Sequence, residues 1–209
     1  MLRELKKIGM IAVLCVSVGL AQADDTAPDV LVKNTTVEVT TILKQDKAEL
    51  TSDPQKLYDL IDTKVLPHFD FTQMTQLAVG HYWRQATPAQ QQDMIKQFRS
   101  LLVRTYAGSL AAFNNQTIEF KPFTLQQGST NAVVQTQVKQ PGAQPIPINY
   151  SMELTPTGWK VYDVSIDSVS LVTNYRGSFG SEIRKEGMAG LIRTLTASNQ
   201  QDTPHTATK

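Results

Sequence analysis

The hydrophobic period of this sequence changes twice, and that change restricts the possible folds more than any other feature. Up to residue 113 the apolar side chains recur at intervals near four, as in amphipathic helices. Between residues 117 and 166 apolar and polar residues alternate, as in strands with one buried face. From residue 171 the helical interval returns. Helices, then strands, then helices predict an α+β fold with helices packed on one face of a sheet.

Four strands are expected in the alternating segment. They are predicted at residues 117–125, 131–139, 146–154 and 159–166. Glycine and proline residues separate them as turns, for example Pro141-Gly142. Because such short links join antiparallel neighbours, we predict a four-stranded antiparallel sheet packed against several helices.

Capping residues mark where several helices begin. Thr87-Pro88-Ala89-Gln90 combines a cap, a proline in the first turn and a capping box, which predicts a long helix up to Asn114-Asn115. Asp53-Pro54 predicts another start, and residues 71–79 a short helix that closes at Gly80. Residues 28–45 carry a β-branched run typical of a strand, but Val32, Val39 and Leu43 fit a helical stripe, so we expect a helix. After Asp167 two helices are expected, divided at Gly187.

The first 23 residues have the three parts of a secretory signal. A basic start is followed by an apolar run of 13 residues, Ile8 to Leu20, and by the small-x-small triplet Ala21-Gln22-Ala23. The run is shorter than the ~20 residues of a membrane-spanning helix. We therefore expect cleavage before Asp24, export to the periplasm, a single domain at residues 24–197 and a polar, disordered tail at 198–209.

Removal of this signal would change the charge and the cysteine content. The 20 basic and 19 acidic residues become 17 and 18, a formal charge of −1, because Arg3, Lys6, Lys7 and Glu4 are lost. A nearly neutral chain lacks the broad basic surface of a nucleic-acid-binding protein, which excludes that class. Cys15, the one cysteine, is also lost, and with it any disulfide, thiol nucleophile or cysteine metal site.

Few residues suggest catalysis. The sequence has no Gly-x-Ser-x-Gly motif, no glycine-rich phosphate loop and no His-Glu-x-x-His zinc motif. Asp163 shares the strand parity of Trp159 and Val161, where a general base in a sheet-lined pocket is conceivable. A buried acceptor bonded to the backbone near a helix N-terminus accounts for it more simply. We predict no catalytic residue and no metal site.

Four segments carry a resemblance to a known family. They are residues 65–71, with Phe69-Asp70-Phe71 after Pro67, then 79–88, 98–106, and 161–164 with 169–176. In this order, over about residues 30–196, they resemble the periplasmic component of the Mla lipid-transport system, also described as toluene-tolerance auxiliary proteins. One position departs from the family, since Ser168 stands where glycine is usual. If the backbone has φ > 0 there, serine costs about 1 kcal/mol or more.

The resemblance implies a soluble, non-catalytic carrier of phospholipid with a lipid cavity between sheet and helices. Phospholipid is then cargo and no cofactor is expected. The implied partners are an outer-membrane lipoprotein–porin complex and the lipid-binding subunit of an inner-membrane ABC transporter. The implied role is to shuttle lipid between these membranes and to maintain the lipid asymmetry of the outer membrane.

A carrier of this kind needs a long apolar slot rather than reactive groups. The inward strand parity and the facing helical stripes supply candidates for contact with acyl chains. These ten residues are Leu102, Tyr106, Leu110, Val134, Val138, Ile148, Tyr150, Met152, Tyr175 and Phe179. Two other interpretations stay open: a small-molecule isomerase- or dehydratase-like enzyme that uses Asp163, and a ligand-free periplasmic scaffold with a closed core.

Overall fold

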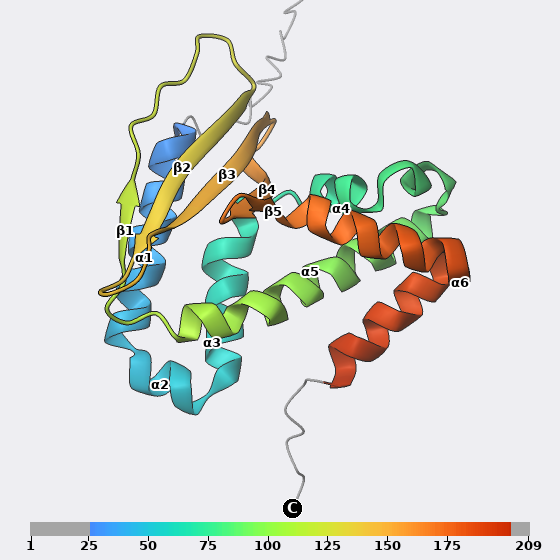
Figure 1. Ribbon diagram of the computed structural model, residues 1–209, viewed down its shortest axis with the longest axis horizontal. Helices are drawn as coiled ribbons and strands as arrows, with labels where there is room; N and C mark the ends of the chain where they lie inside the picture. The colour runs from blue at the N-terminus through green and yellow to red at the C-terminus, as the bar shows by residue number, and fades with distance from the viewer. Residues whose placement is uncertain (1–25, 202–209) are drawn as a thin grey trace, which may run out of the picture.

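Residues 26–201 are described by a computed structural model that contains six α-helices and five strands (Figure 1). The α-helices are α1 (Pro28–Gln45), α2 (Lys47–Ser52), α3 (Pro54–Leu60), α4 (Phe71–Val79), α5 (Pro88–Ala111) and α6 (Leu171–Gln201). Three short helical turns also occur, η1 (Ile61–Val65), η2 (Leu66–His68) and η3 (Gly80–Gln85). The strands are β1 (Thr117–Phe120), β2 (Asn131–Lys139), β3 (Ile146–Thr155), β4 (Gly158–Ile166) and β5 (Val169–Ser170).

The predicted helix starts are confirmed by their caps. Thr87 and Gln90 form a complete capping box at the start of α5, with Pro88 in the first turn. Asp53 accepts a hydrogen bond from the Gln55 backbone at the start of α3. Helices α1 and α4 occupy the predicted residues 28–45 and 71–79. Helix α5 ends at Ala111, three residues before Asn114.

The sheet is an antiparallel meander of five strands in the order β1-β2-β3-β4-β5, one strand more than predicted. The additional strand, β5, has only two residues, which is too few to show an alternating pattern. Strand β1 ends at Phe120, five residues earlier than predicted. Lys121 still donates its N–H to the Gln135 carbonyl at 3.0 Å, but Pro122 has no N–H with which to continue the ladder.

A two-residue turn joins β4 to β5 and directs the chain into α6. Asp167 and Ser168 both have positive φ, 49° and 66°. Two successive residues with positive φ are typical of a tight β-hairpin turn, in which glycine is favoured at the second position. The condition under which serine is costly at position 168, a positive φ, is therefore met.

Helix α6 consists of two arms that fold back on each other (Figure 1). Gly187, at φ 70° and ψ 177°, divides them as predicted. The second arm reaches Gln201, so residues 198–201 are helical rather than part of a disordered tail. Asn199 anchors this end, because its side-chain amide donates to the Gln97 carbonyl of α5 at 3.0 Å.

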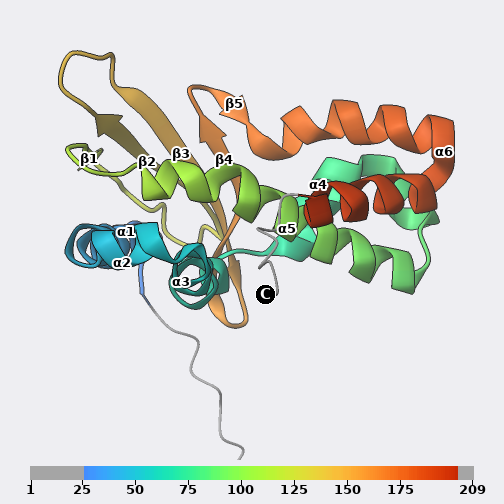
Figure 2. The same ribbon diagram turned by 90° about the horizontal axis from the view of Figure 1, so that it is seen from below.

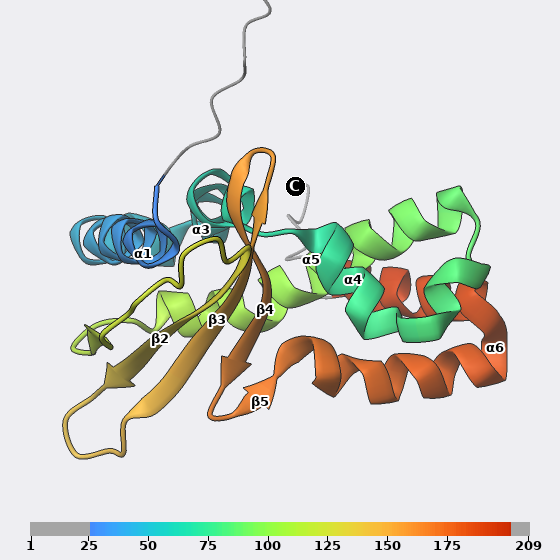
Figure 3. The ribbon, with the colours of Figure 1, turned by 90° about the horizontal axis from the view of Figure 1, so that it is seen from above.

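Helix α5 crosses the whole molecule and takes part in both of its cores (Figures 2 and 3). At one end it lies with α4 and both arms of α6 in a bundle, and at the other it runs beside the sheet and α1–α3. The larger core joins this bundle to the sheet, through residues such as Phe98, Val134, Met152 and Phe179. The smaller core lies between α1, α3, η1 and the end of α5, around Leu43, Leu57 and Ala107.

The expected signal at residues 1–23, Cys15 within it and the end of the predicted tail at 202–209 lie outside the described residues. None of the helices within residues 26–201 has the length and apolar character required to cross a bilayer.

Candidate functional site

The five strand residues predicted to contact acyl chains lie on the same face of the sheet. Val134 pairs with Tyr150, and both alternate with residues of the opposite face. The neighbouring pairs Ala132–Met152, Thr136–Ile148 and Val138–Ile146 lie on the same side. The face continues onto β1 through Phe120 and onto β4 through Ile166.

Four of the five predicted helical residues belong to the core that includes this face or pack against that core. Leu102 and Tyr106 on α5, and Tyr175 and Phe179 on α6, belong to the same core as Val134 and Met152 or pack against it. Leu110 packs instead against the smaller core, and Val138 belongs to neither core. The structure therefore brings together eight of the ten residues, and their contact with lipid stays a prediction.

Exposure to solvent divides this region into a closed part and an open part. Phe98 and Met152 are fully buried, Val134 is 2% exposed and Phe179 is 3% exposed. Sixteen further apolar or aromatic residues pack against the same core and are only partly buried. We call six of them, which lie on the inner face of the sheet or on α5 and α6, the seam. The seam residues are Tyr106, Phe120, Ile148, Tyr150, Ile166 and Tyr175. In a fully closed core, residues that face another layer would be buried, so the seam is where apolar surface of the inner face stays accessible.

The seam is apolar and uncharged, apart from its three phenols. Burial raises the pKa of the Tyr150 phenol, and an interaction with the Thr136 side chain partly opposes this increase. The Thr136 hydroxyl in turn donates to the Ile148 carbonyl at 3.1 Å. Thr136 was not among the predicted residues because it is polar. Thr136 lies two residues from Val134 and from Val138 along β2, and this spacing could have predicted that it lies on the same face.

Asp163 lies apart from this region. Ser151 pairs with Asp163 but Met152 pairs with Val161, so Tyr162 is an extra residue on β4. Asp163 therefore shares the face of Ser151, and the prediction that grouped it with Trp159 and Val161 is wrong. Strand parity cannot be counted across a bulge.

The expected structural role of Asp163 is confirmed. Its Oδ1 accepts a hydrogen bond from the Val172 N–H at 3.2 Å, and its Oδ2 accepts one from the Ser170 hydroxyl at 2.6 Å. Val172 is in the first turn of α6, where a carboxylate is favoured by the unpaired N–H groups and the helix dipole. Asp163 thus fixes the start of α6 on the sheet.

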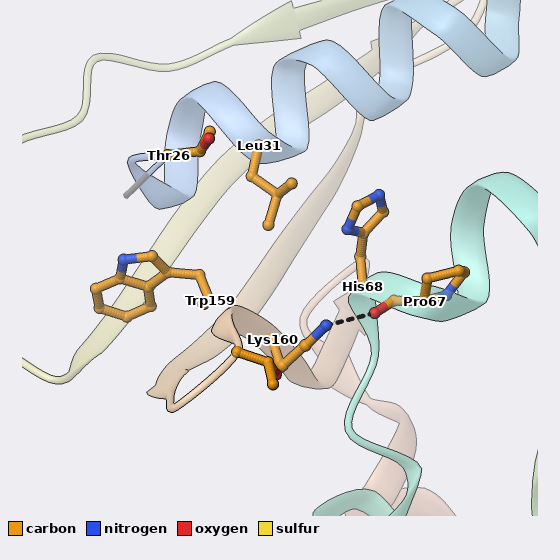
Figure 4. Close-up of a pocket in the computed structure, with 8 residues that line it drawn as sticks. Thr26, Leu31, Pro67, His68, Trp159 and Lys160 are labelled. Atoms are coloured by element: carbon orange, nitrogen blue, oxygen red, sulfur yellow. Dashed lines mark hydrogen bonds between the residues drawn. The ribbon is translucent and has the colours of Figure 1, made fainter. Parts of the chain in front are cut away.

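Two surface pockets lie away from the seam. One, of about 130 Å³, opens between the start of α1 and the β3–β4 turn, where the Lys160 ammonium donates to the Pro67 carbonyl at 2.7 Å beside His68 (Figure 4). The other, of about 350 Å³, lies between β2 and residues 122–129. The ten predicted residues line neither pocket, so the volume of the predicted slot also stays a prediction. Within residues 26–201, no group of three histidine, cysteine or acidic residues is arranged to hold a metal ion.

Comparisons with known proteins agree with this architecture. Two curated relatives are similar over most of their length. The toluene tolerance protein ttg2D of Pseudomonas putida is 28% identical over 180 residues, 86% of this chain and 83% of the relative. The intermembrane phospholipid transport system binding protein MlaC of Haemophilus influenzae is 23% identical over 181 residues, 85% of this chain and 84% of the relative.

A solved structure is also similar to this chain. It is a phospholipid-binding protein from Ralstonia solanacearum, in complex with a phospholipid, and it superposes with a TM-score of 0.78. The sequences are 39% identical, and the match covers 84% of this chain and 98% of that one. The family described as MlaC protein matches residues 33–197. Most of the chain lies within this match, and the chain therefore belongs to the MlaC protein family.

Proposed function

We propose that this protein carries phospholipid through the periplasm, with the acyl chains enclosed between the inner face of the sheet and helices α5 and α6. The observation that carries the proposal is the seam. It is a band of accessible apolar side chains on the inner face of the sheet and the two helices that face it. The relative from Ralstonia solanacearum, which has the same fold and binds a phospholipid, supports it.

The free energy of exposing acyl chains to water explains why an apolar surface is sufficient for a lipid carrier. A diacyl lipid has roughly 30 methylenes, and at ~0.8 kcal/mol each their exposure to water costs on the order of 24 kcal/mol. Unassisted passage of lipid through water is therefore negligible. A carrier must cover the chains, and it needs no reactive group for this. Both oxygens of Asp163 accept hydrogen bonds, one from the Ser170 hydroxyl of β5 and one from the Val172 N–H of α6, which supports a carrier rather than an enzyme.

The route of the lipid is part of the proposal. The carrier exchanges phospholipid with an outer-membrane lipoprotein–porin complex and with the lipid-binding subunit of an inner-membrane ABC transporter. This exchange maintains the lipid asymmetry of the outer membrane. The name of the Haemophilus influenzae relative, which places it in an intermembrane phospholipid transport system, supports this route. The expected signal at residues 1–23 supports export to the periplasm.

Native mass spectrometry of the purified protein tests the carrier function. We expect a mass increase that corresponds to one or more phospholipids, identified after extraction. The delipidated protein should then take up lipid from donor vesicles and release it to acceptor vesicles. A protein that purifies empty and takes up no lipid would refute the proposal and favour the ligand-free scaffold. Turnover of a small substrate that depends on Asp163 would favour the enzyme.

A further inference from the structure

Two tyrosines of the seam come from different helices and pack against the same core. Tyr175 on α6 is held in an aromatic cluster, with its ring centroid 5.2 Å from that of Phe98 and 5.4 Å from that of Phe179. Phe98 is fully buried and Phe179 nearly so, whereas Tyr175 is half-buried. The ring of Tyr175 is therefore packed on the apolar core while part of the side chain stays accessible.

Tyr106 packs against this core from α5. It follows Phe98 and Leu102 at intervals of four residues, so it lies on the same stripe of the helix. Burial raises the pKa of its phenol, and the charge interaction with Tyr175 raises it further. The phenol of Tyr106 therefore stays protonated at neutral pH and keeps its hydrogen for donation.

The phenols of Tyr106 and Tyr175 differ from that of Tyr150 in their partners. The Tyr150 phenol interacts with the Thr136 side chain. Among the hydrogen bonds between residues 26 and 201, none involves the phenol of Tyr106 or Tyr175. A phenol on apolar surface usually has a partner, because an unpaired donor that loses its water costs about 1–3 kcal/mol. Closure of the seam over acyl chains would remove that water, so the cargo itself has to supply the acceptors.

The two arginines nearest in sequence to Tyr106 and Tyr175 make their contacts elsewhere. The Arg104 guanidinium donates to the Ser198 carbonyl at 3.0 Å. The Arg176 guanidinium lies over Gly80, with Nε 3.2 Å from the position that a Cβ would take there. The donors of Tyr106 and Tyr175 are neutral, and they suit a neutral carbonyl better than a phosphate, which requires charged donors when it is buried.

From this geometry we infer that Tyr106 and Tyr175 bind the ester carbonyls of the lipid, and that the site selects lipids with ester-linked chains. The inference rests on the proposed carrier function. A glycerophospholipid has two such carbonyls, located between its chains and its phosphate. With the chains on the core side of the seam, the carbonyls meet the two phenols and the phosphate remains in solvent. The site therefore discriminates between lipids by the linkage of their chains and not by their headgroup.

Competition between ester- and ether-linked lipids tests this directly. The delipidated protein is incubated with vesicles that contain equal amounts of dioleoyl phosphatidylethanolamine and its diether analogue, which has the same chains and headgroup but no carbonyls. Bound lipid is then extracted and quantified by mass spectrometry. Because one neutral hydrogen bond gives roughly a threefold preference, two should enrich the diester about tenfold.

Isosteric variants assign the preference to the two phenols. Tyr106→Phe and Tyr175→Phe should each reduce the enrichment to about threefold, and the double variant should bind both lipids equally while its total lipid load is retained. Tyr58→Phe, at a half-buried tyrosine that packs on the smaller core, is the matched control and should keep the full enrichment.

The outcomes separate this inference from the proposed function. Equal uptake of the two lipids by the wild type would overturn ester recognition and leave the carrier function intact. Enrichment that persists in the double variant would overturn the role of these two residues. Uptake of neither lipid would refute the carrier function itself.

Discussion

Substitution of Val134 by tryptophan should fill the place where the acyl chains lie. Val134 is on the inner face of β2 opposite Tyr150 and is 2% exposed, whereas its neighbour Val133 is on the outer face and 49% exposed. Val134→Trp and Val133→Trp are therefore the same change, one residue apart, on opposite sides of the sheet. Only the first should interfere with lipid.

The packing at Val134 determines how much lipid affinity and how much stability the substitution should remove. An indole that displaces about four methylenes of a chain removes ~3 kcal/mol of binding, which is roughly a hundredfold in affinity. Overpacking of a closed core costs about 1–3 kcal/mol, which for a domain of this size lowers Tm by about 2–10 °C. If lipid-free protein leaves space beside Val134, the loss of stability should lie below this range.

The loss of affinity is measured by the lipid load after purification and by uptake from vesicles. The loss of stability is measured by thermal denaturation of delipidated protein. Val133→Trp should change neither by a comparable amount. Ile148→Trp is a second test on the same face at a half-buried position, where overpacking is milder. Folded Val134→Trp or Ile148→Trp protein with a normal lipid load would refute the assignment of the chains to this face.

Three further predictions concern the framework of the site. Ser168→Gly should stabilise the protein by about 1 kcal/mol in urea denaturation, because glycine adopts φ 66° without the strain of a side chain; a loss of stability would contradict this. Asp163→Ala should destabilise it by about 2–3 kcal/mol in the same assay, because the Val172 N–H and the Ser170 hydroxyl lose a charged acceptor, and an unchanged midpoint would exclude that role. Lys139, Gln137 and Lys121 hold the pKa of Glu119 at about 2, below its usual 4.5. Its contribution to stability is therefore present above pH 4.5 and lost as the pH falls towards 2. Thermal denaturation of Glu119→Gln should lack this acid-dependent part, which is small because solvent screens the exposed carboxylate.

Local chemistry allowed most of the helices to be predicted, including one for which the signals conflicted. The run from Thr35 to Thr41 is β-branched and favoured a strand, yet it lies inside α1. Thr40 and Thr41 donate their hydroxyls to the carbonyls four residues earlier, which satisfies them within a helix. Burial of Val39 against the smaller core outweighs the weak propensity of the run.

The features that were missed depend on pairing between strands, which local patterns do not contain. The bulge at Tyr162 reverses the parity of β4 beyond it, and only the register with β3 reveals it. The same register places polar Thr136 on the inner face. For the candidate site, alternation placed the predicted residues of β2 and β3 on one face, since the pairing of these two strands is regular throughout. Leu110 packs against the smaller core because α5 contributes to two cores, and the spacing of its apolar residues does not distinguish them.

The burial of the inner face also bears on how a carrier releases its cargo. If nothing covered Val134 and Met152 in the lipid-free protein, binding would gain the whole free energy of chain transfer and release would be slow. Val134 and Met152 are instead buried in one core with residues of α5 and α6, so lipid must replace contacts that the protein already makes. The net affinity is then the difference between chain burial and the lost packing, well below ~24 kcal/mol. Competition between the lipid and the protein's own packing thus makes loading reversible, which transfer between two membranes requires. Variants that loosen this packing without blocking the slot should hold lipid more tightly and deliver it more slowly to acceptor vesicles.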